Sequence, residues 1–162
     1  MCYRNNETFI GKKITMPSGE THIKINWIVL IIINIIIVFF HTIIEIKEFA
    51  LFNILYILMS YLISPDLDID SSVYKRWGIF RWIWYPYREI MKHRGLSHSV
   101  VFGPISIIFN LVLYILPVIL FINMIDQIPI IRFEGQLAEV TLISIICIFI
   151  IVEIHILADK IF

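Results

Sequence analysis

The amino-acid sequence predicts an all-α integral membrane protein with four transmembrane helices in one domain, residues 1–162. Hydrophobic residues make up 59% of the chain, whereas about half is usual for a soluble domain. Four apolar runs approach the roughly 20 residues that are needed to cross about 30 Å of hydrocarbon. These runs cover residues 27–44, 49–64, 100–123 and 140–158.

The second run is the shortest, and Pro65 follows it closely. Proline disfavours helical geometry at the preceding residue, so we expect this helix to end near Ser64. A basic, aromatic segment, "RWGIFRWIWYPYREIMKH", then precedes the third run. We expect it to lie in the membrane interface rather than to cross the bilayer. An aromatic anchor is the favoured interpretation, and the alternative is that its arginines also bind an anionic substrate or lipid headgroup.

Basic residues are distributed unequally between the two ends of the predicted spans. Lys47 and Arg132 fall on one side, and the other 11 of the 13 Lys and Arg residues fall in the N-terminal segment, the 65–99 loop and the C-terminal tail. Loops rich in Lys and Arg usually stay in the cytoplasm. The count therefore predicts that both termini and the 65–99 loop are cytoplasmic.

A histidine, an aspartate or both lie at the predicted cytoplasmic end of each of the four runs. An Asp within a membrane costs roughly 2.5–3.5 kcal/mol on the insertion scale, and such residues usually mark function. Imidazole and carboxylate together are ligands for zinc, manganese or iron. We therefore expect a cytoplasmic site for a divalent metal, with zinc favoured.

Local spacing refines this expectation. His155 and Asp159 are four residues apart and would share one helix face. An extended "SPDLDID" stretch would place Asp66 and Asp68 on one side, with Asp70 favoured as a helix cap. His93 and His98 flank a turn at Gly95, where Ser97 could cap the next helix, as Thr21 could cap the first.

Four sequence blocks carry a family resemblance: "PSGETH", "SPDLDIDSSVYKRWGIFRWIWYPYR", "HRGLSHS" and "HILAD". They resemble an uncharacterised family of metal-binding membrane proteins, related to membrane-bound, metal-dependent hydrolase-like proteins with an HRG-[TS]-HS motif. The resemblance departs at Ile23, where an acidic residue would be expected after the first histidine, so one carboxylate ligand is absent. The metal positions that the resemblance implies are His22, Asp66, Asp68, His93, His98, His155 and Asp159.

Three functions remain open. The first is a metal-dependent hydrolase that acts on a phosphoester or lipid at the cytoplasmic leaflet, with Asp68 as candidate general base. In that case Arg76, Arg88 and Arg94 could hold phosphate oxygens. The second is a non-catalytic structural or sensing protein, and a metal transporter is less favoured because no charged relay crosses the spans. Seven candidate ligands exceed the four of a closed structural site and favour an open or binuclear one. The expected partners are membrane lipids and a small-molecule or lipid substrate, with no nucleic acid.

Overall fold

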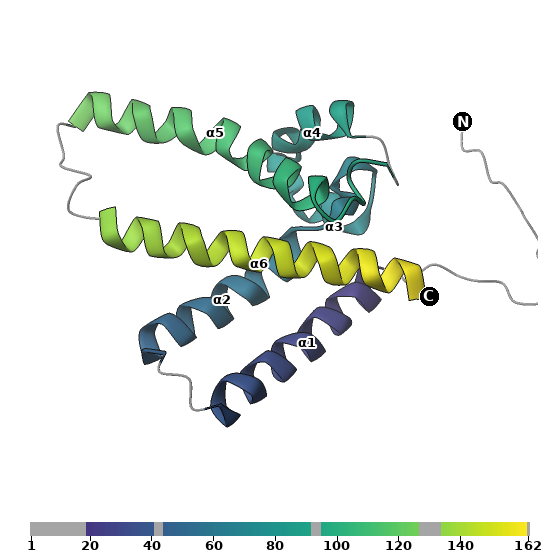
Figure 1. The fold of residues 1–162 in the computed structure, drawn as a ribbon. Helices are drawn as coiled ribbons and strands as arrows, with labels where there is room; N and C mark the ends of the chain where they lie inside the picture. Colours follow the sequence, from purple (N-terminus) through teal and green to yellow (C-terminus); the bar gives the residue numbers. More distant parts are fainter. Residues whose placement is uncertain (1–18, 41–43, 92–94, 127–133, 162) are drawn as a thin grey trace, which may run out of the picture.

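The computed structural model describes residues 19–40, 44–91, 95–126 and 134–161, and these residues are mostly helical with no strand among them (Figure 1). The long helices are α1 (Gly19–Phe39), α2 (Ile46–Leu62), α5 (Phe102–Asp126) and α6 (Glu134–Ile161). Short helices lie between α2 and α5: η1 (Pro65–Asp68), α3 (Ser72–Arg76), η2 (Gly78–Trp84) and α4 (Tyr85–Ile90).

The long helices form two antiparallel hairpins, α1 with α2 and α5 with α6 (Figure 1). Helix α6 contacts α1, α2 and α5 and is therefore central to the fold. The start of α1, the end of α2, the start of α5 and the end of α6 lie toward one end of the molecule, and the opposite ends diverge. This arrangement brings residues from distant parts of the sequence together at the convergent end.

Three helical segments are long and apolar enough to span a membrane: α1, residues 102–122 of α5 and residues 135–161 of α6. Helix α2 has 17 residues. At about 1.5 Å per residue it falls short of the roughly 30 Å hydrocarbon core. The described residues thus confirm the predicted all-α class. Three of their helices have the length and apolar character expected of a membrane span.

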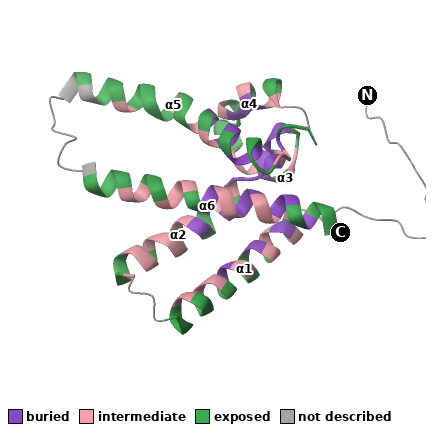
Figure 2. Cartoon of the chain, viewed as in Figure 1, coloured by how far each residue is buried: buried purple, intermediate pink, exposed green. Residues whose placement is uncertain are grey.

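The core lies at the convergent end, where buried residues gather in Figure 2. One cluster of buried side chains includes Leu67, Trp84, Ile107 and Val152, from η1, η2, α5 and α6. A second cluster lies between α1, α2 and α6 and includes Tyr56 and Ile151. Packing is therefore concentrated around the end of the bundle that carries the predicted metal ligands.

Helix α1 begins before the apolar run that starts at residue 27. His22 and Asn26 occupy its first turns, are both buried, and lie four residues apart on one face. Tyr56 Oη donates a hydrogen bond of 3.3 Å to Asn26 Oδ1. Hydropathy alone misses this segment because its inward face is polar. Thr21 consequently lies inside the helix, and its predicted capping role is wrong.

The "SPDLDID" stretch is not extended, and this prediction was wrong. Pro65 begins the 3₁₀ helix η1, and the Ser64 hydroxyl caps it by accepting a hydrogen bond of 3.2 Å from the Asp66 N–H. A 3₁₀ helix has 3.0 residues per turn, so residues two apart differ by about 240° in direction. Asp66 and Asp68 therefore point in different directions.

The predicted capping residue of the next helix is also corrected. Ser71, not Asp70, caps α3, because its hydroxyl accepts a hydrogen bond of 3.1 Å from the Tyr74 N–H. Asp70 instead forms an exposed ion pair with Lys75 at 3.2 Å. Asp70 thus belongs to the surface.

The described part of the basic, aromatic segment folds as the short helices η2 and α4, which contact α3, η1 and α5. Trp84 and Tyr87 are buried in this layer, whereas Trp82 and Tyr85 are exposed. The Asn110 side chain donates a hydrogen bond of 3.1 Å to the Ile83 carbonyl and joins α5 to η2. The segment thus has an inner face that packs on the bundle and an outer aromatic face.

Candidate metal centre

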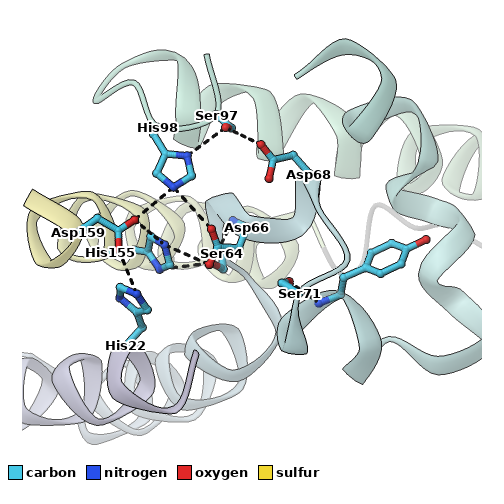
Figure 3. Close-up of polar contacts among 10 residues, drawn as sticks. His22, Ser64, Asp66, Asp68, Ser71, Ser97, His98, His155 and Asp159 are labelled. Carbon is cyan, nitrogen blue, oxygen red and sulfur yellow. Dashed lines mark hydrogen bonds and ion pairs between the residues drawn. The ribbon is translucent and has the colours of Figure 1, made fainter. Parts of the chain in front are cut away.

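Five ionisable side chains from four parts of the fold meet at the convergent end (Figure 3). Three are histidines and two are aspartates: His22 from α1, Asp66 from η1, His98 from the turn before α5, and His155 and Asp159 from α6. The i, i+4 spacing of His155 and Asp159 places both on one face, as the sequence predicts.

The imidazole nitrogens lie close to carboxylate oxygens. The Asp159 Oδ2 atom is 3.3 Å from His98 Nε2 and 3.4 Å from His155 Nε2. The two Asp66 oxygens lie 3.6 Å from His98 Nε2 and 3.5 Å from His155 Nε2. The Asp159 Oδ1 atom is 3.2 Å from His22 Nε2.

Two overlapping sets of possible ligand atoms result. One joins His22, His155 and Asp159, and the other joins Asp66, His98 and His155, with all atoms of a set within 4.8 Å of one another. Ligands at about 2.0–2.2 Å from a tetrahedral zinc would be separated by about 3.3–3.6 Å. Hydrogen bonds between nitrogen and oxygen are usually shorter, near 2.9–3.0 Å. The imidazole–carboxylate separations of 3.2–3.6 Å are close to the spacing of zinc co-ligands, and the other separations within each set are at most 4.8 Å.

The centre has a buried wall and a more open wall. His22 and His155 side chains are 7% and 3% exposed, whereas Asp66 and Asp159 are 22% and 30% exposed. The Nε2 atom of His155 is buried and makes no hydrogen bond within the described residues. A cavity of about 10 Å³ adjoins His22, Asp66 and His155. That volume is close to one water-sized sphere, which suits a single ion or water.

The electrostatics favour ionised Asp66. Burial alone would raise the pKa of its carboxyl, but the close imidazoles of His155 and His98 outweigh burial and hold the pKa well below its usual range. Asp66 is therefore available as an anionic ligand. Because a metal ligand must be deprotonated, this state suits cation binding.

Comparison with known proteins assigns the chain to a family that is described as metal-binding. Residues 17–162 match the family described as uncharacterized metal-binding protein (DUF2227). The chain belongs to this family.

The other comparisons are more limited in extent. A protein of Aquifex aeolicus (strain VF5), described as an uncharacterized protein, is 34% identical over 61 residues. The match covers 37% of this chain and 43% of that protein, which is less than half of its length. No solved structure matches the chain.

The remaining predicted ligands of this metal-binding protein lie elsewhere or outside the described residues. Asp68 is buried, and its Oδ2 atom accepts a hydrogen bond of 2.8 Å from the Ser97 hydroxyl. It is in neither set of possible ligand atoms. His93 and Arg94 fall outside the residues that the structure describes.

The two described arginines predicted to bind substrate lie on aromatic rings. The Arg76 guanidinium is 4.3 Å from the centre of the Tyr61 ring and donates a hydrogen bond to the Tyr61 carbonyl. The Arg88 guanidinium is 4.4 Å from the centre of the Tyr74 ring, and its Nε donates a hydrogen bond of 3.4 Å to the Asp68 carbonyl. Arg88 is thus hydrogen-bonded directly to the backbone of η1.

Two buried serines contact the outer nitrogens of the histidine rings. Ser64 Oγ lies 3.3 Å from His155 Nδ1, and Ser97 Oγ lies 3.1 Å from His98 Nδ1. The sequence predicts a helix cap at Ser97, but α5 begins at Phe102, so that prediction is wrong. The sequence predicts no role for Ser64. Each serine lies within two residues of a candidate ligand, and this closeness in the sequence is the signal that could have identified the two serines.

Gly103 allows α5 to approach the turn that carries His98. A Cβ atom at Gly103 would lie 2.7 Å from the Ser97 carbonyl oxygen, whereas a Cβ at Gly135 would have no neighbour within 4 Å. We expect Gly103→Ala to displace the turn and lower the free energy of unfolding by about 1–3 kcal/mol. Gly135→Ala, the control, should be neutral or stabilising. Denaturant titration in detergent measures both, and equal effects of the two substitutions would contradict the prediction.

Proposed function

We propose that this protein holds a divalent cation at the membrane surface and uses it to hydrolyse a phosphoester or lipid at the cytoplasmic leaflet. The observation that carries the proposal is the buried Nε2 atom of His155. It lacks a hydrogen-bond partner among the described residues, although oxygens of Asp66 and Asp159 lie 3.5 and 3.4 Å away. A cation between these atoms would satisfy all three.

We propose His98, His155, Asp66 and Asp159 as the inner ligand set, drawn from both sets of possible ligand atoms, because both carboxylates lie 3.3–3.6 Å from the Nε2 atoms of both imidazoles. Nitrogen and oxygen ligands favour zinc, while manganese and iron accept the same donors. His22 adds either a fifth ligand or a partner for the second oxygen of Asp159, from which it lies 3.2 Å. His93 remains a proposed ligand on the basis of the sequence alone.

Hydrolysis is supported by the exposure of the two carboxylates, which leaves one side of the centre accessible. A bound cation supplies Lewis acidity there, lowering the pKa of a water and polarising a substrate oxygen. Arg88 contacts η1 and is the described arginine best placed to assist with an anionic substrate. Asp68 bonds to Ser97, so any general-base role of Asp68 would act through the Ser97 hydroxyl and His98.

A structural role is the second candidate. The ligands come from α1, η1, the turn before α5, and α6, and the adjoining cavity of about 10 Å³ is too small for an organic substrate. A cation would then tie these elements together without catalysis. Transport is less favoured because the five side chains come from the start of α1, from η1, from the turn before α5 and from the end of α6, which lie toward one end of the molecule.

We further propose that the chain crosses the membrane four times. The starts of α1 and α5 lie at the same end of the molecule, so a chain that crosses with α1 must return with α2. A short span can be accommodated by local thinning of the bilayer. The basic residues favour a cytoplasmic location for the metal centre and both termini.

The first prediction concerns metal content. Purified protein should bind about one zinc ion per chain, and His155→Ala or Asp66→Asn should greatly reduce binding, because the first removes a ligand nitrogen and the second removes the negative charge of a ligand carboxylate. Elemental analysis after equilibrium dialysis measures the content. Glu153→Gln is the matched control, because Glu153 is also on α6 but lines a different cavity with Val100 and Lys160. Full zinc binding by His155→Ala would contradict the proposed ligand set.

The second prediction concerns catalysis. Zinc-loaded protein should hydrolyse a chromogenic phosphoester or a micellar phospholipid, whereas chelator treatment should abolish the activity and added zinc should restore it. Asp159→Asn should lose activity, and Glu153→Gln should retain it. Loaded protein that is inactive on both substrates would favour the structural role.

The third prediction concerns topology. A reporter that is active only in the cytoplasm should be active when fused after Phe162, because of the uneven distribution of Lys and Arg. The same reporter inserted beside Lys47 should be inactive. The reverse pattern, at normal expression, would place the metal centre on the opposite side of the membrane.

A further inference from the structure

We propose that Ser64 and Ser97 are positioning residues that keep the proton of His155 and His98 on Nδ1 of each ring. We further propose that Asp68 holds Ser97 in place rather than binding the cation. The inference rests on the proposed metal centre. It separates two neighbouring aspartates of η1 by role: Asp66 acts as a ligand and Asp68 as a support.

The Ser97 hydroxyl has one proton, and the geometry directs it to the Asp68 carboxylate at 2.8 Å. Its oxygen can then only accept at His98 Nδ1, which lies 3.1 Å away. The His98 proton therefore resides on Nδ1. The lone pair on His98 Nε2 faces Asp66 and Asp159, where a cation would bind.

Ser64 occupies the equivalent position beside His155, where the second lone pair of its hydroxyl oxygen can accept the Nδ1 proton. Its oxygen accepts the Asp66 N–H at 3.2 Å and lies 3.3 Å from His155 Nδ1. With a proton on Nδ1, the buried Nε2 of His155 carries a lone pair toward the same two carboxylates. Ser64 also caps η1, so one hydroxyl orients both a histidine and the backbone that carries Asp66.

The burial of this support supplies the rigidity that positioning requires. Ser97 is 0% exposed, Ser64 is 4% exposed and Asp68 is 7% exposed. A carboxylate that acts through a hydroxyl also increases the basicity of the imidazole beyond it. Partners of this kind typically change metal affinity by about 10–100-fold.

The test compares zinc affinities of full-length variants in detergent by competition with a chromophoric chelator. Ser97→Ala and Ser64→Ala should each weaken zinc binding by about 10–100-fold. The control is Ser106→Ala, since Ser106 is a buried serine in the first turns of α5 that donates its hydrogen bond of 2.8 Å to the Gly103 carbonyl. Its affinity should stay within about twofold of the wild type. Ser97→Thr, which keeps the hydroxyl, should restore most of the affinity lost in Ser97→Ala.

A second readout separates positioning from general destabilisation. Cobalt replaces zinc, and its visible absorption reports ligand geometry. The bands should change in Ser97→Ala and remain unchanged in Ser106→Ala. Asp68→Asn should bind cobalt with reduced affinity, whereas Asp66→Asn should show almost no site-bound cobalt.

The outcomes distinguish the two proposals. Wild-type protein that binds neither zinc nor cobalt would overturn the metal centre and this inference together. A wild type that binds zinc, with Ser97→Ala and Ser64→Ala matching Ser106→Ala in affinity and spectrum, would overturn only the positioning role. If Asp68→Asn loses cobalt as completely as Asp66→Asn, Asp68 is a ligand and its supporting role is wrong. A Ser97→Ala variant that does not fold leaves Ser64→Ala and Asp68→Asn to decide.

Discussion

Charge compensation at the convergent end of the helices is the constraint on which the rest of the structure depends. Asp66 and Asp159 lie among three imidazoles where apolar helices meet. Partly buried carboxylates are costly without compensation. Protons on the histidines could supply it, but the rings of His22 and His155 stack at 3.8 Å, and two cations so close would repel. One divalent cation would balance both carboxylates and leave the imidazoles neutral.

This constraint links the metal centre to the architecture. Buried side chains concentrate around the centre, whereas the far ends of α1, α2 and α5 are mainly exposed or partly exposed (Figure 2). The pair formed by Asn34 and Asn53, with hydrogen bonds of 2.7 and 3.3 Å, supports the α1–α2 hairpin away from the centre. The convergent end therefore carries most of the packing, and metal binding would stabilise the fold there because the ligands come from separate elements.

The sequence predicted the composition of the centre better than its local geometry. The spacing of His155 and Asp159 requires only helical periodicity, so it was sufficient. The start of α1 was missed because buried polar residues interrupt the apolar run. The conformation of η1 depends on a proline and a serine cap, which an alternating pattern of aspartates does not reveal. The hydrogen bond from Ser97 to Asp68 joins residues 29 positions apart, and no local pattern encodes such a contact.

The 3₁₀ conformation of η1 explains how a short acidic motif can serve two purposes. In an extended strand, Asp66 and Asp68 would face one side and place two negative charges beside the same histidines. In η1 they diverge: Asp66 faces His98 and His155, and Asp68 faces Ser97. Because Ser97 also contacts His98, the second charge acts on the centre through a hydroxyl rather than directly. In the proposed centre, two carboxylates would thus face the cation, while a third would increase the basicity of His98 through Ser97.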